Sequence, residues 1–323
     1  MLETKKTTPP RFGARSTARE VIAGHNLSGR DAIVTGGASG IGVETVRALA
    51  TAGARVVIAT RDASKGEEVA ARLRSETGKD AIEFRPLDLA SLASVSAFVE
   101  QFLALRRPLH LLINNAGIMA TPLSYTADGF ESQFGTNHVG HFALTVGLLP
   151  ALKAAGGARI VSLTSLGHRR SDVHFDDLDF HRRPYDPWLA YGQSKTANVL
   201  FAVGLTQRFV CDGIVANAVH PGGIMTGLQK HVPREEQIRL GWIDQSGILH
   251  PRLKNTEQGA ATSIWAAVAP ALEGLGGHYL EDCEIAEPWS DDKPMSGVKP
   301  YALDPDRAQR LWSVSVKLIE RDR

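Results

Sequence analysis

The sequence predicts an α/β fold: a single doubly wound domain with a parallel sheet, substrate-loop insertions and a C-terminal helical tail. Short apolar stretches of strand length alternate with segments of helical periodicity, and the connections between them are short. This alternation is typical of a parallel sheet that helices cover on both faces. It never lapses long enough to mark a second core, so one domain is favoured over two.

The expected elements follow one another in a regular order. The expected strands cover residues 31–35, 55–59, 81–87, 109–114, 158–163, 214–219 and 277–280. The expected helices cover residues 43–52, 63–77, 91–105, 128–153, 187–209 and 256–268. Residues 222–255 and 282–303 are richer in turns and mixed polar residues, which indicates loops over a ligand site.

The two ends of the chain are expected to differ from the domain at 27–285. Residues 1–26 form a polar arm that ends in a short helix, whose start is marked by the capping-box pair Thr17 and Glu20. Residues 286–323 form a tail, in which an Asp-Pro pair begins an amphipathic helix that packs back on the domain. The apolar side chains of that helix are Leu311, Trp312, Val316 and Leu318.

Composition excludes several classes of protein. The 323 residues are 43% hydrophobic and 22% charged with a formal net charge of +1, so neither nucleic acid nor an acidic membrane surface is expected as a partner. Cys211 and Cys283 are the two cysteines, too few for a disulfide framework, and both are expected to be packing residues. The chain lacks an apolar run of about 18 residues and a signal-peptide core. A cytoplasmic protein is therefore expected.

A glycine-rich turn joins the first expected strand to the first expected helix. It reads Thr-Gly-Gly-Ala-Ser-Gly-Ile-Gly over Thr35–Gly42. Glycines permit a tight turn there, and they let a pyrophosphate approach the N–H groups at the start of the helix. The candidate cofactor-binding residues of this turn are Gly36, Ser39, Gly40, Ile41 and Gly42.

A tyrosine and a lysine lie one turn apart on a later helix. Asp186 and Pro187 mark its start, and the apolar spacing beyond them places Tyr191 and Lys195 on one face. A cation within about 4–6 Å favours the phenolate, so Lys195 is expected to lower the pKa of Tyr191 toward working pH. Taken alone, such a pair is common on exposed helices, and its role rests on the remaining motifs.

Three motifs together resemble a known family. The spacing T-G-x-x-x-G-x-G, the segment Asn114-Asn-Ala-Gly117 after the fourth strand, and Tyr191-x-x-x-Lys195 occur in the order found in classical short-chain dehydrogenases/reductases. The resemblance covers about residues 27–285 and implies a Rossmann-type domain. Thr136–Phe142, together with an enlarged segment before the tyrosine, is similar to the retinol-dehydrogenase-like branch.

The resemblance also implies roles for individual residues. Tyr191 would exchange the proton with a substrate oxygen, Lys195 would lower its pKa and hold the nicotinamide ribose, and Ser165 would steady that oxygen. Ser162 and Thr164 compete for the serine role. Asn137 would position a water for proton transfer. The remaining cofactor contacts that the resemblance implies are Asp88, Leu89, Asn115, Ala116, Gly117, Pro221, Gly222, Ile224 and Thr226. Without the resemblance, Asp88 reads equally well as a helix cap.

The end of the second strand indicates the cofactor. An acidic residue there binds the ribose of NAD, whereas a nearby arginine accommodates the phosphate of NADP. The chain has Thr60 at the acidic position, followed by Arg61, with Asp62 one step beyond. We therefore expect NADP(H) rather than NAD(H), with Arg61 as a cofactor-binding residue.

Other polar features are read as structural. His138 and His141 have helical spacing but no further ligands nearby, so core or surface histidines are expected rather than a metal site. Residues 168–187 read as a mixed-charge surface insert. Ser165 with His168 lacks the G-x-S-x-G context of a hydrolase nucleophile.

These observations predict an NADP(H)-dependent enzyme that interconverts an alcohol and a ketone or aldehyde. Apolar residues in the expected loops favour a lipophilic substrate; they are Ile224, Met225, Leu228, Trp242, Ile243, Ile248 and Trp289. A redox sensor that holds NADP(H) without turnover is the alternative from another class, and a carbon–carbon double-bond reductase is a further one. The family habit implies a homodimer or homotetramer.

Overall fold

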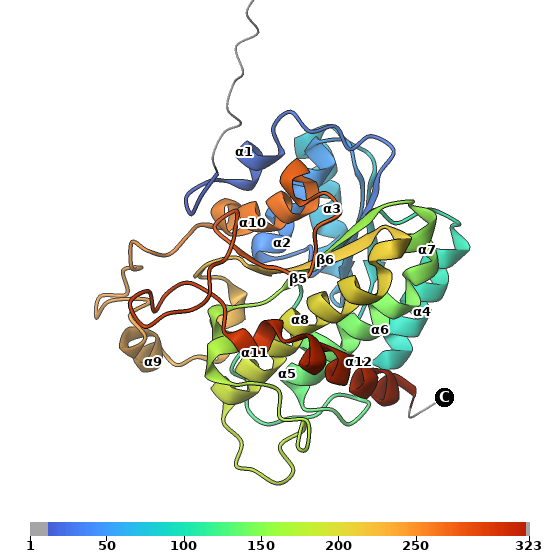
Figure 1. Cartoon of the computed structure of the whole chain (residues 1–323). Helices are drawn as coiled ribbons and strands as arrows, with labels where there is room; N and C mark the ends of the chain where they lie inside the picture. The colour runs from blue at the N-terminus through green and yellow to red at the C-terminus, as the bar shows by residue number, and fades with distance from the viewer. Residues whose placement is uncertain (1–11, 321–323) are drawn as a thin grey trace, which may run out of the picture.

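Eight strands form one sheet in the order β3-β2-β1-β4-β5-β6-β7-β8 in the computed structural model, which describes residues 12–320 (Figure 1). Residues 1–11 of the expected arm lie outside the described residues. The strands are β1 (Asp31–Thr35), β2 (Arg55–Thr60), β3 (Ile82–Pro86), β4 (Leu111–Asn114), β5 (Ala158–Leu163), β6 (Ile214–His220), β7 (Tyr279–Glu281) and β8 (Glu284–Ile285). Neighbouring strands from β3 to β7 are parallel, and β8 runs antiparallel to β7. The predicted doubly wound fold is confirmed.

Helices cover both faces of the sheet. The longer ones are α2 (Gly40–Thr51), α3 (Ala63–Thr77), α4 (Leu92–Ala104), α6 (Gly140–Gly147), α8 (Pro187–Phe209), α10 (Thr256–Val268) and α12 (Pro305–Glu320). On β1, Ala32 and Val34 pack in the cluster of α2, α3 and α10, while Ile33 packs in that of α4, α6 and α8. A fully buried Val or Ile side chain contributes about 1.5–3 kcal/mol. This two-sided burial explains why the strands read as continuous apolar runs.

Both ends of the described chain pack on the domain. The short helix α1 (Ala18–Ile22) begins at the capping box of Thr17 and Glu20. At the other end, the Asp304 carboxylate accepts the N–H of Arg307 at 2.9 Å. The buried side chain of Leu311 helps to hold α12 against α8.

The predicted helix at 128–153 is confirmed only in part, because the helical residues begin at Ser132 and form four consecutive segments rather than one helix. They are α5 (Ser132–Phe134), a π-helical turn η1 (Gly135–Val139), α6 and α7 (Leu149–Ala154). The Glu131 carboxylate accepts the N–H groups of Gln133 and Phe134, so the helix begins at Ser132, four residues after the predicted start. The π turn adds a residue to the helical repeat, which apolar periodicity does not reveal.

Smaller differences concern loops and cysteines. Helix α2 begins at Gly40 rather than at residue 43, and β8 was not predicted. The expected loops at 222–255 and 282–303 contain short helices, namely η4 (Gly227–His231), α9 (Arg234–Arg239) and α11 (Pro300–Leu303). Cys283 is buried as expected, but Cys211 is exposed and does not serve as a packing residue. It lies in the short turn η3 (Val210–Asp212), beyond the buried length of α8.

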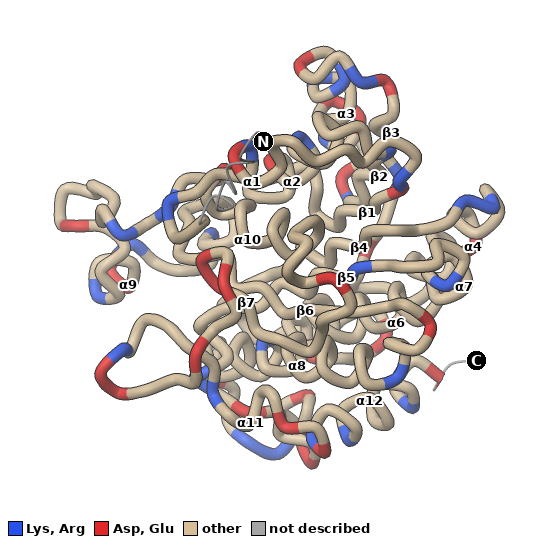
Figure 2. Tube along the Cα trace, turned by 45° about the horizontal axis from the view of Figure 1, so that its top comes forward, with Lys and Arg blue, Asp and Glu red and all other residues tan. Residues whose placement is uncertain are grey.

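Charged residues of both signs are interspersed along the outer helices and loops (Figure 2). Over residues 12–320, no helix is long and apolar enough to cross a membrane.

The hydroxyl of Thr35 joins three parts of the fold. It accepts the N–H groups of Asn115 and Ala116, each at 2.9 Å, and lies 2.9 Å from Nε2 of His141. Nδ1 of His141 lies 2.9 Å from the carbonyl oxygen of Asn137. Because a carbonyl only accepts, Nδ1 carries the proton and Nε2 accepts from Thr35. The end of β1 is thereby tied both to the segment after β4 and to the π-helical turn.

Substituting Thr35→Val should lower the free energy of unfolding by about 1–3 kcal/mol, because two N–H groups and a buried imidazole lose their partner. Urea unfolding measures the change. Thr45→Val is the matched control, since the equally buried Thr45 hydroxyl donates only to the Ile41 carbonyl of its own helix. An equal loss in both variants would contradict the prediction.

Candidate active site

A cavity of about 1330 Å³ opens where β1, β4, β5 and β6 end. Its wall contains most of the residues singled out in the sequence, from the glycine turn at one end to Tyr191 at the other. This position follows from the strand order, because the chain leaves β1 and β4 toward opposite sides of the sheet and a crevice remains between them. The size suits a dinucleotide together with a small substrate.

The glycine turn has the geometry that an anion site needs. Gly36 and Gly40 have φ of +64° and +52°, in the left-handed region that favours glycine. Ser39 makes no side-chain cap, so the first N–H groups of α2 are left for a ligand. Gly42 does not line the cavity. A Cβ there would stand 2.3 Å from the Gly36 carbonyl oxygen, so this glycine permits close packing of helix and strand.

The side chains after β2 separate into two roles. Arg61 lines the cavity together with Lys65. Asp62 instead caps α3, since its Oδ1 accepts the N–H of Lys65 at 3.0 Å. Its carboxylate is therefore engaged in the helix start and lies outside the cavity wall.

The segments after β3 and β4 form the floor beside the glycine turn. Asp88 and Leu89 both line the cavity. Asp88 accepts the N–H of Ala90 at 3.0 Å, while Ser91 is the cap of α4, so the helix-cap interpretation of Asp88 is wrong. The floor continues through Asn115, Ala116 and Gly117.

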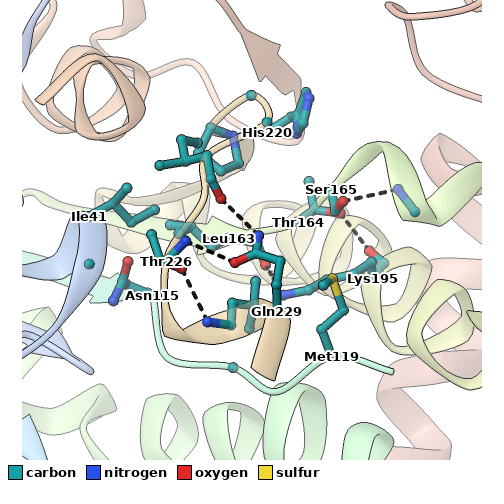
Figure 3. A pocket seen from close by; sticks show the side chains of 18 of the residues that line it. Ile41, Asn115, Met119, Leu163, Thr164, Ser165, Lys195, His220, Thr226 and Gln229 are labelled. Atoms are coloured by element: carbon teal, nitrogen blue, oxygen red, sulfur yellow. Dashed lines mark hydrogen bonds between the residues drawn. The ribbon is translucent and has the colours of Figure 1, made fainter. Parts of the chain in front are cut away.

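The turn after β6 covers the cavity from the opposite side. Pro221, Gly222, Ile224 and Thr226 all line it. The Thr226 hydroxyl accepts the N–H of Leu228, and the Gln229 side chain donates to the Ile224 carbonyl (Figure 3).

Ser165, Tyr191 and Lys195 meet at the far end of the cavity. Helix α8 begins at the Asp186 cap, as predicted, and both Tyr191 and Lys195 are buried. Lys195 Nζ lies 5.6 Å from the centre of the Tyr191 ring and donates to the Leu163 carbonyl at 3.1 Å (Figure 3).

Of the three competing hydroxyls, Ser165 is the one within hydrogen-bonding reach of Tyr191. It lines the cavity at the end of β5 and accepts the N–H of Gly167 at 3.0 Å. Ser162 instead donates to the Asn198 carbonyl at 3.1 Å, and Thr164 to the Lys195 carbonyl at 2.8 Å.

The expected lowering of the tyrosine pKa is wrong for the protein alone. Burial raises the pKa of Tyr191 to about 12, and the hydrogen bond from Ser165 offsets this only in part. Burial also lowers the pKa of Lys195 to about 8. Desolvation disfavours each charged form, and this effect outweighs the attraction expected between ammonium and phenolate.

Asn137 lies behind the cavity wall. Its amide donates to the Ile118 carbonyl and to the Ser194 hydroxyl, each at 2.9 Å, while its Oδ1 accepts the N–H of Ile118. A Cβ on Gly117 would stand 3.1 Å from Oδ1 of Asn137 and 3.5 Å from Nζ of Lys195. The asparagine is therefore close to the lysine, although its side chain is fully engaged with protein groups.

The two histidines lie in the core, whereas the surface interpretation of the insert is wrong in part. His138 and His141 are buried, with Nε2 of His138 placed 2.8 Å from the Ser315 hydroxyl. Within the described residues, no group of three or more His, Cys, Asp or Glu could hold a metal ion. The 168–187 insert is not all surface, because several of its side chains are buried in the fold; they are His168, Val173, Leu178 and Phe180.

Most of the expected loop residues face the cavity, but two do not. Ile243 and Ile248 lie outside the wall, and Ile248 is 66% exposed. Lining residues that sequence reasoning missed include Arg15, Met119, Trp188, His220 and Lys254. Met119 and Trp188 lie within a few residues of recognised motifs, and His220 directly precedes Pro221, whereas Arg15 had no local signal.

Two curated relatives cover nearly the whole chain. A probable oxidoreductase of Streptomyces antibioticus is 48% identical over 292 residues, which are 89% of this chain and 96% of that protein. Retinol dehydrogenase 12 of Mus musculus is 42% identical over 293 residues, 91% of this chain and 87% of that protein.

Solved structures agree with these relatives. An uncharacterized protein from Mycobacterium paratuberculosis superposes with a TM-score of 0.72 at 34% identity, covering 95% of this chain and 98% of that one. The Pseudomonas aeruginosa RhlG/NADP active-site complex superposes with a TM-score of 0.61 at 28% identity, covering 79% and 95%. The family model for short chain dehydrogenase matches residues 30–237. The chain therefore belongs to the short-chain dehydrogenase/reductase family of oxidoreductases, in its retinol-dehydrogenase-like branch.

Proposed function

We propose that this protein is an NADP(H)-dependent oxidoreductase that interconverts a lipophilic ketone or aldehyde and the corresponding alcohol. One observation carries the proposal: a hydroxyl, a phenol and an ammonium from Ser165, Tyr191 and Lys195 line one end of a cavity whose other end is a glycine turn. These three side chains together suit proton exchange with a substrate oxygen, and the glycine turn suits a pyrophosphate.

The residues present fit a dinucleotide with a 2′-phosphate. The uncapped start of α2 and the left-handed glycines Gly36 and Gly40 would hold the pyrophosphate. Arg61 and Lys65 line the cavity after β2, and the nearby carboxylate of Asp62 is occupied as a helix cap. A related solved structure is described as an NADP complex. When bound, NADP(H) supplies or accepts the hydride.

The protein's own contribution is to handle the proton. Because its pKa is raised, the Tyr191 phenol is protonated at neutral pH and suited to donate to a carbonyl oxygen. Ser165 would donate a second hydrogen bond to that oxygen as negative charge develops on it. Lys195 would hold the nicotinamide ribose and stabilise the phenolate that donation leaves behind.

The wall beyond Tyr191 favours an apolar substrate. The cluster around Met119, Trp188, Leu228 and Trp242 packs together on this side of the cavity. Apolar and aromatic walls of this kind bind ligands chiefly by excluding water. The similarity to a retinol dehydrogenase supports the same class of substrate.

Replacing Tyr191 with Phe should reduce turnover at least about a hundredfold, because the proton donor is removed. Loss of NADPH absorbance is followed with a panel of aldehydes, ketones, steroids and enones, and the products are identified. Tyr185→Phe is the control, since the Tyr185 hydroxyl bonds to the Thr121 carbonyl and lies outside the cavity wall. Retained activity in Tyr191→Phe would contradict the proposed mechanism. Tight NADPH binding without any turnover would favour a sensor, and saturated products from enones would favour a double-bond reductase.

The Arg61→Ala variant should lose about tenfold or more in kcat/KM for NADPH and little for NADH, because a guanidinium–phosphate contact is worth about 1.5–3 kcal/mol. Kinetics with both cofactors measure the selectivity. Arg72→Ala, which changes an arginine of α3 outside the cavity wall, serves as control. A wild-type preference for NADH, or equal losses with both cofactors, would contradict the assignment.

Lys195→Met should abolish turnover yet raise stability at pH 7 by about 2–4 kcal/mol. The folded pKa of about 8 lies below the ordinary value of 10.5, so the unfolded wild type binds more protons between these values. Wild-type stability therefore rises from pH 8 to 10.5, and the advantage of the variant shrinks over that range.

Urea unfolding at several pH values measures this advantage. The Leu163 carbonyl keeps a donor in Lys195→Met, because Asn198 also bonds to it at 2.9 Å. Lys195→Arg keeps the buried charge and should show no gain in stability. A variant advantage that is absent at pH 7, or that does not change with pH, would refute the burial argument.

A further inference from the structure

The N-terminal segment is packed into the domain although it precedes the family match at residue 30. Ala18, Val21 and Ile22 of α1 are at most 5% exposed. They belong to the apolar cluster that includes α2 and α10, and α1 lies beside α10 (Figure 1). This anchoring brings the residues just before the helix, Ala14 and Arg15, to the rim of the cavity.

Arg15 is tied by two hydrogen bonds to residues 251–254 and by a third to the start of α10. Its Nη1 donates to the Leu253 carbonyl at 3.1 Å, and its Nη2 donates to the Pro251 carbonyl at 2.6 Å. Its own carbonyl accepts from the Gln258 side chain at 3.2 Å. The guanidinium thus holds two carbonyls of residues 251–254 at once, which a single ammonium could not do with the same geometry.

Residues 251–254 in turn support the glycines after β6. Lys254 donates its N–H to the Gly223 carbonyl at 2.8 Å, and its Nζ bonds to Asp282 at 2.6 Å. A Cβ on Gly222 would stand 2.8 Å from the Lys254 side chain, and one on Gly223 would stand 2.9 Å from Leu253. The segment therefore lies directly behind the turn at Gly222–Gly223.

We propose that Arg15 is a cofactor-positioning residue, through which the N-terminal segment holds residues 251–254 against the turn at Gly222–Gly223. The inference rests on the proposed binding of a nicotinamide dinucleotide in this cavity. Two of the five guanidinium donors bond to carbonyls, so the charge at the rim can also attract the phosphates of the dinucleotide. Because the turn would contact the part that NADP(H) and NAD(H) share, Arg15 should affect both cofactors alike, unlike Arg61.

The test measures dissociation constants for NADPH and NADH by quenching of tryptophan fluorescence, since Trp188, Trp242 and Trp289 line the cavity. Arg15→Ala should weaken both cofactors by a similar factor of roughly five to ten. Arg15→Lys should recover only part of this loss. Arg19→Ala is the matched control, because Arg19 is exposed on α1 and lies outside the cavity wall. It should bind both cofactors as the wild type does.

Hydrogen exchange without cofactor provides a second readout. In Arg15→Ala and Arg15→Lys the Lys254 amide should exchange faster, while amides in the middle of α10 should stay as protected as in the wild type. Unchanged binding and exchange in Arg15→Ala would overturn the proposal. A loss confined to NADPH would assign Arg15 to the 2′-phosphate instead, and full recovery in Arg15→Lys would reduce its role to charge. A wild type that binds neither cofactor would refute the proposed function and this inference together.

Discussion

The site depends on the hydrogen bonds of the Thr35 hydroxyl, at the point where the chain crosses from one half of the sheet to the other. The chain leaves β1 toward β2 and β3, and then returns to β4 on the opposite side, so the helices that follow these strands diverge. A crevice opened in this way needs a fixed edge. Thr35 supplies it by accepting two N–H groups of the segment after β4, and His141 extends the link to the Asn137 carbonyl. The cavity wall beside the glycine turn and the wall nearest Lys195 therefore share one fixed point.

Burial shapes the chemistry at the other end of the cavity. Tyr191 and Lys195 are 4% and 5% exposed, so neither charged form is solvated by water. The structure retains both groups although an apolar pair would pack at lower cost, which is the pattern expected where function opposes stability. Under the proposed function, the same burial would keep the phenol neutral until an oxygen is placed to receive its proton. The pKa of Tyr191 would then depend more on the depth of α8 in the fold than on the neighbouring ammonium.

Local patterns predicted most of the fold, and most of the residues that they singled out line one cavity. Strand and helix bounds were recoverable wherever caps and apolar periods agreed, as at Asp186 and in α3. Prediction failed where the deciding contact is distant in sequence or adds an irregular residue, as in the π turn at Gly135–Val139. It failed again for the pKa of Tyr191, because the helical spacing gives the distance to Lys195 but not the surrounding dielectric. Gly42 lies outside the cavity wall, and the space for a side chain there is taken by the Gly36 carbonyl.

Part of the cavity wall, including Ala14 and Arg15 of the N-terminal arm, lies outside residues 30–237, the region that the family model matches. The wall around the glycine turn is built from backbone turns at strand ends, and such turns require particular residues, chiefly glycine and asparagine, at particular places. The part of the wall outside residues 30–237 comes from Ala14 and Arg15 of the arm and from side chains within residues 240–299. These segments meet across large distances in sequence, since Arg15 and Leu253 are 238 residues apart. Contacts of that kind impose no local pattern, so they can differ between chains that share every motif residue. Similarity over the motifs therefore constrains the chemistry of this site more tightly than it constrains how the cavity is closed.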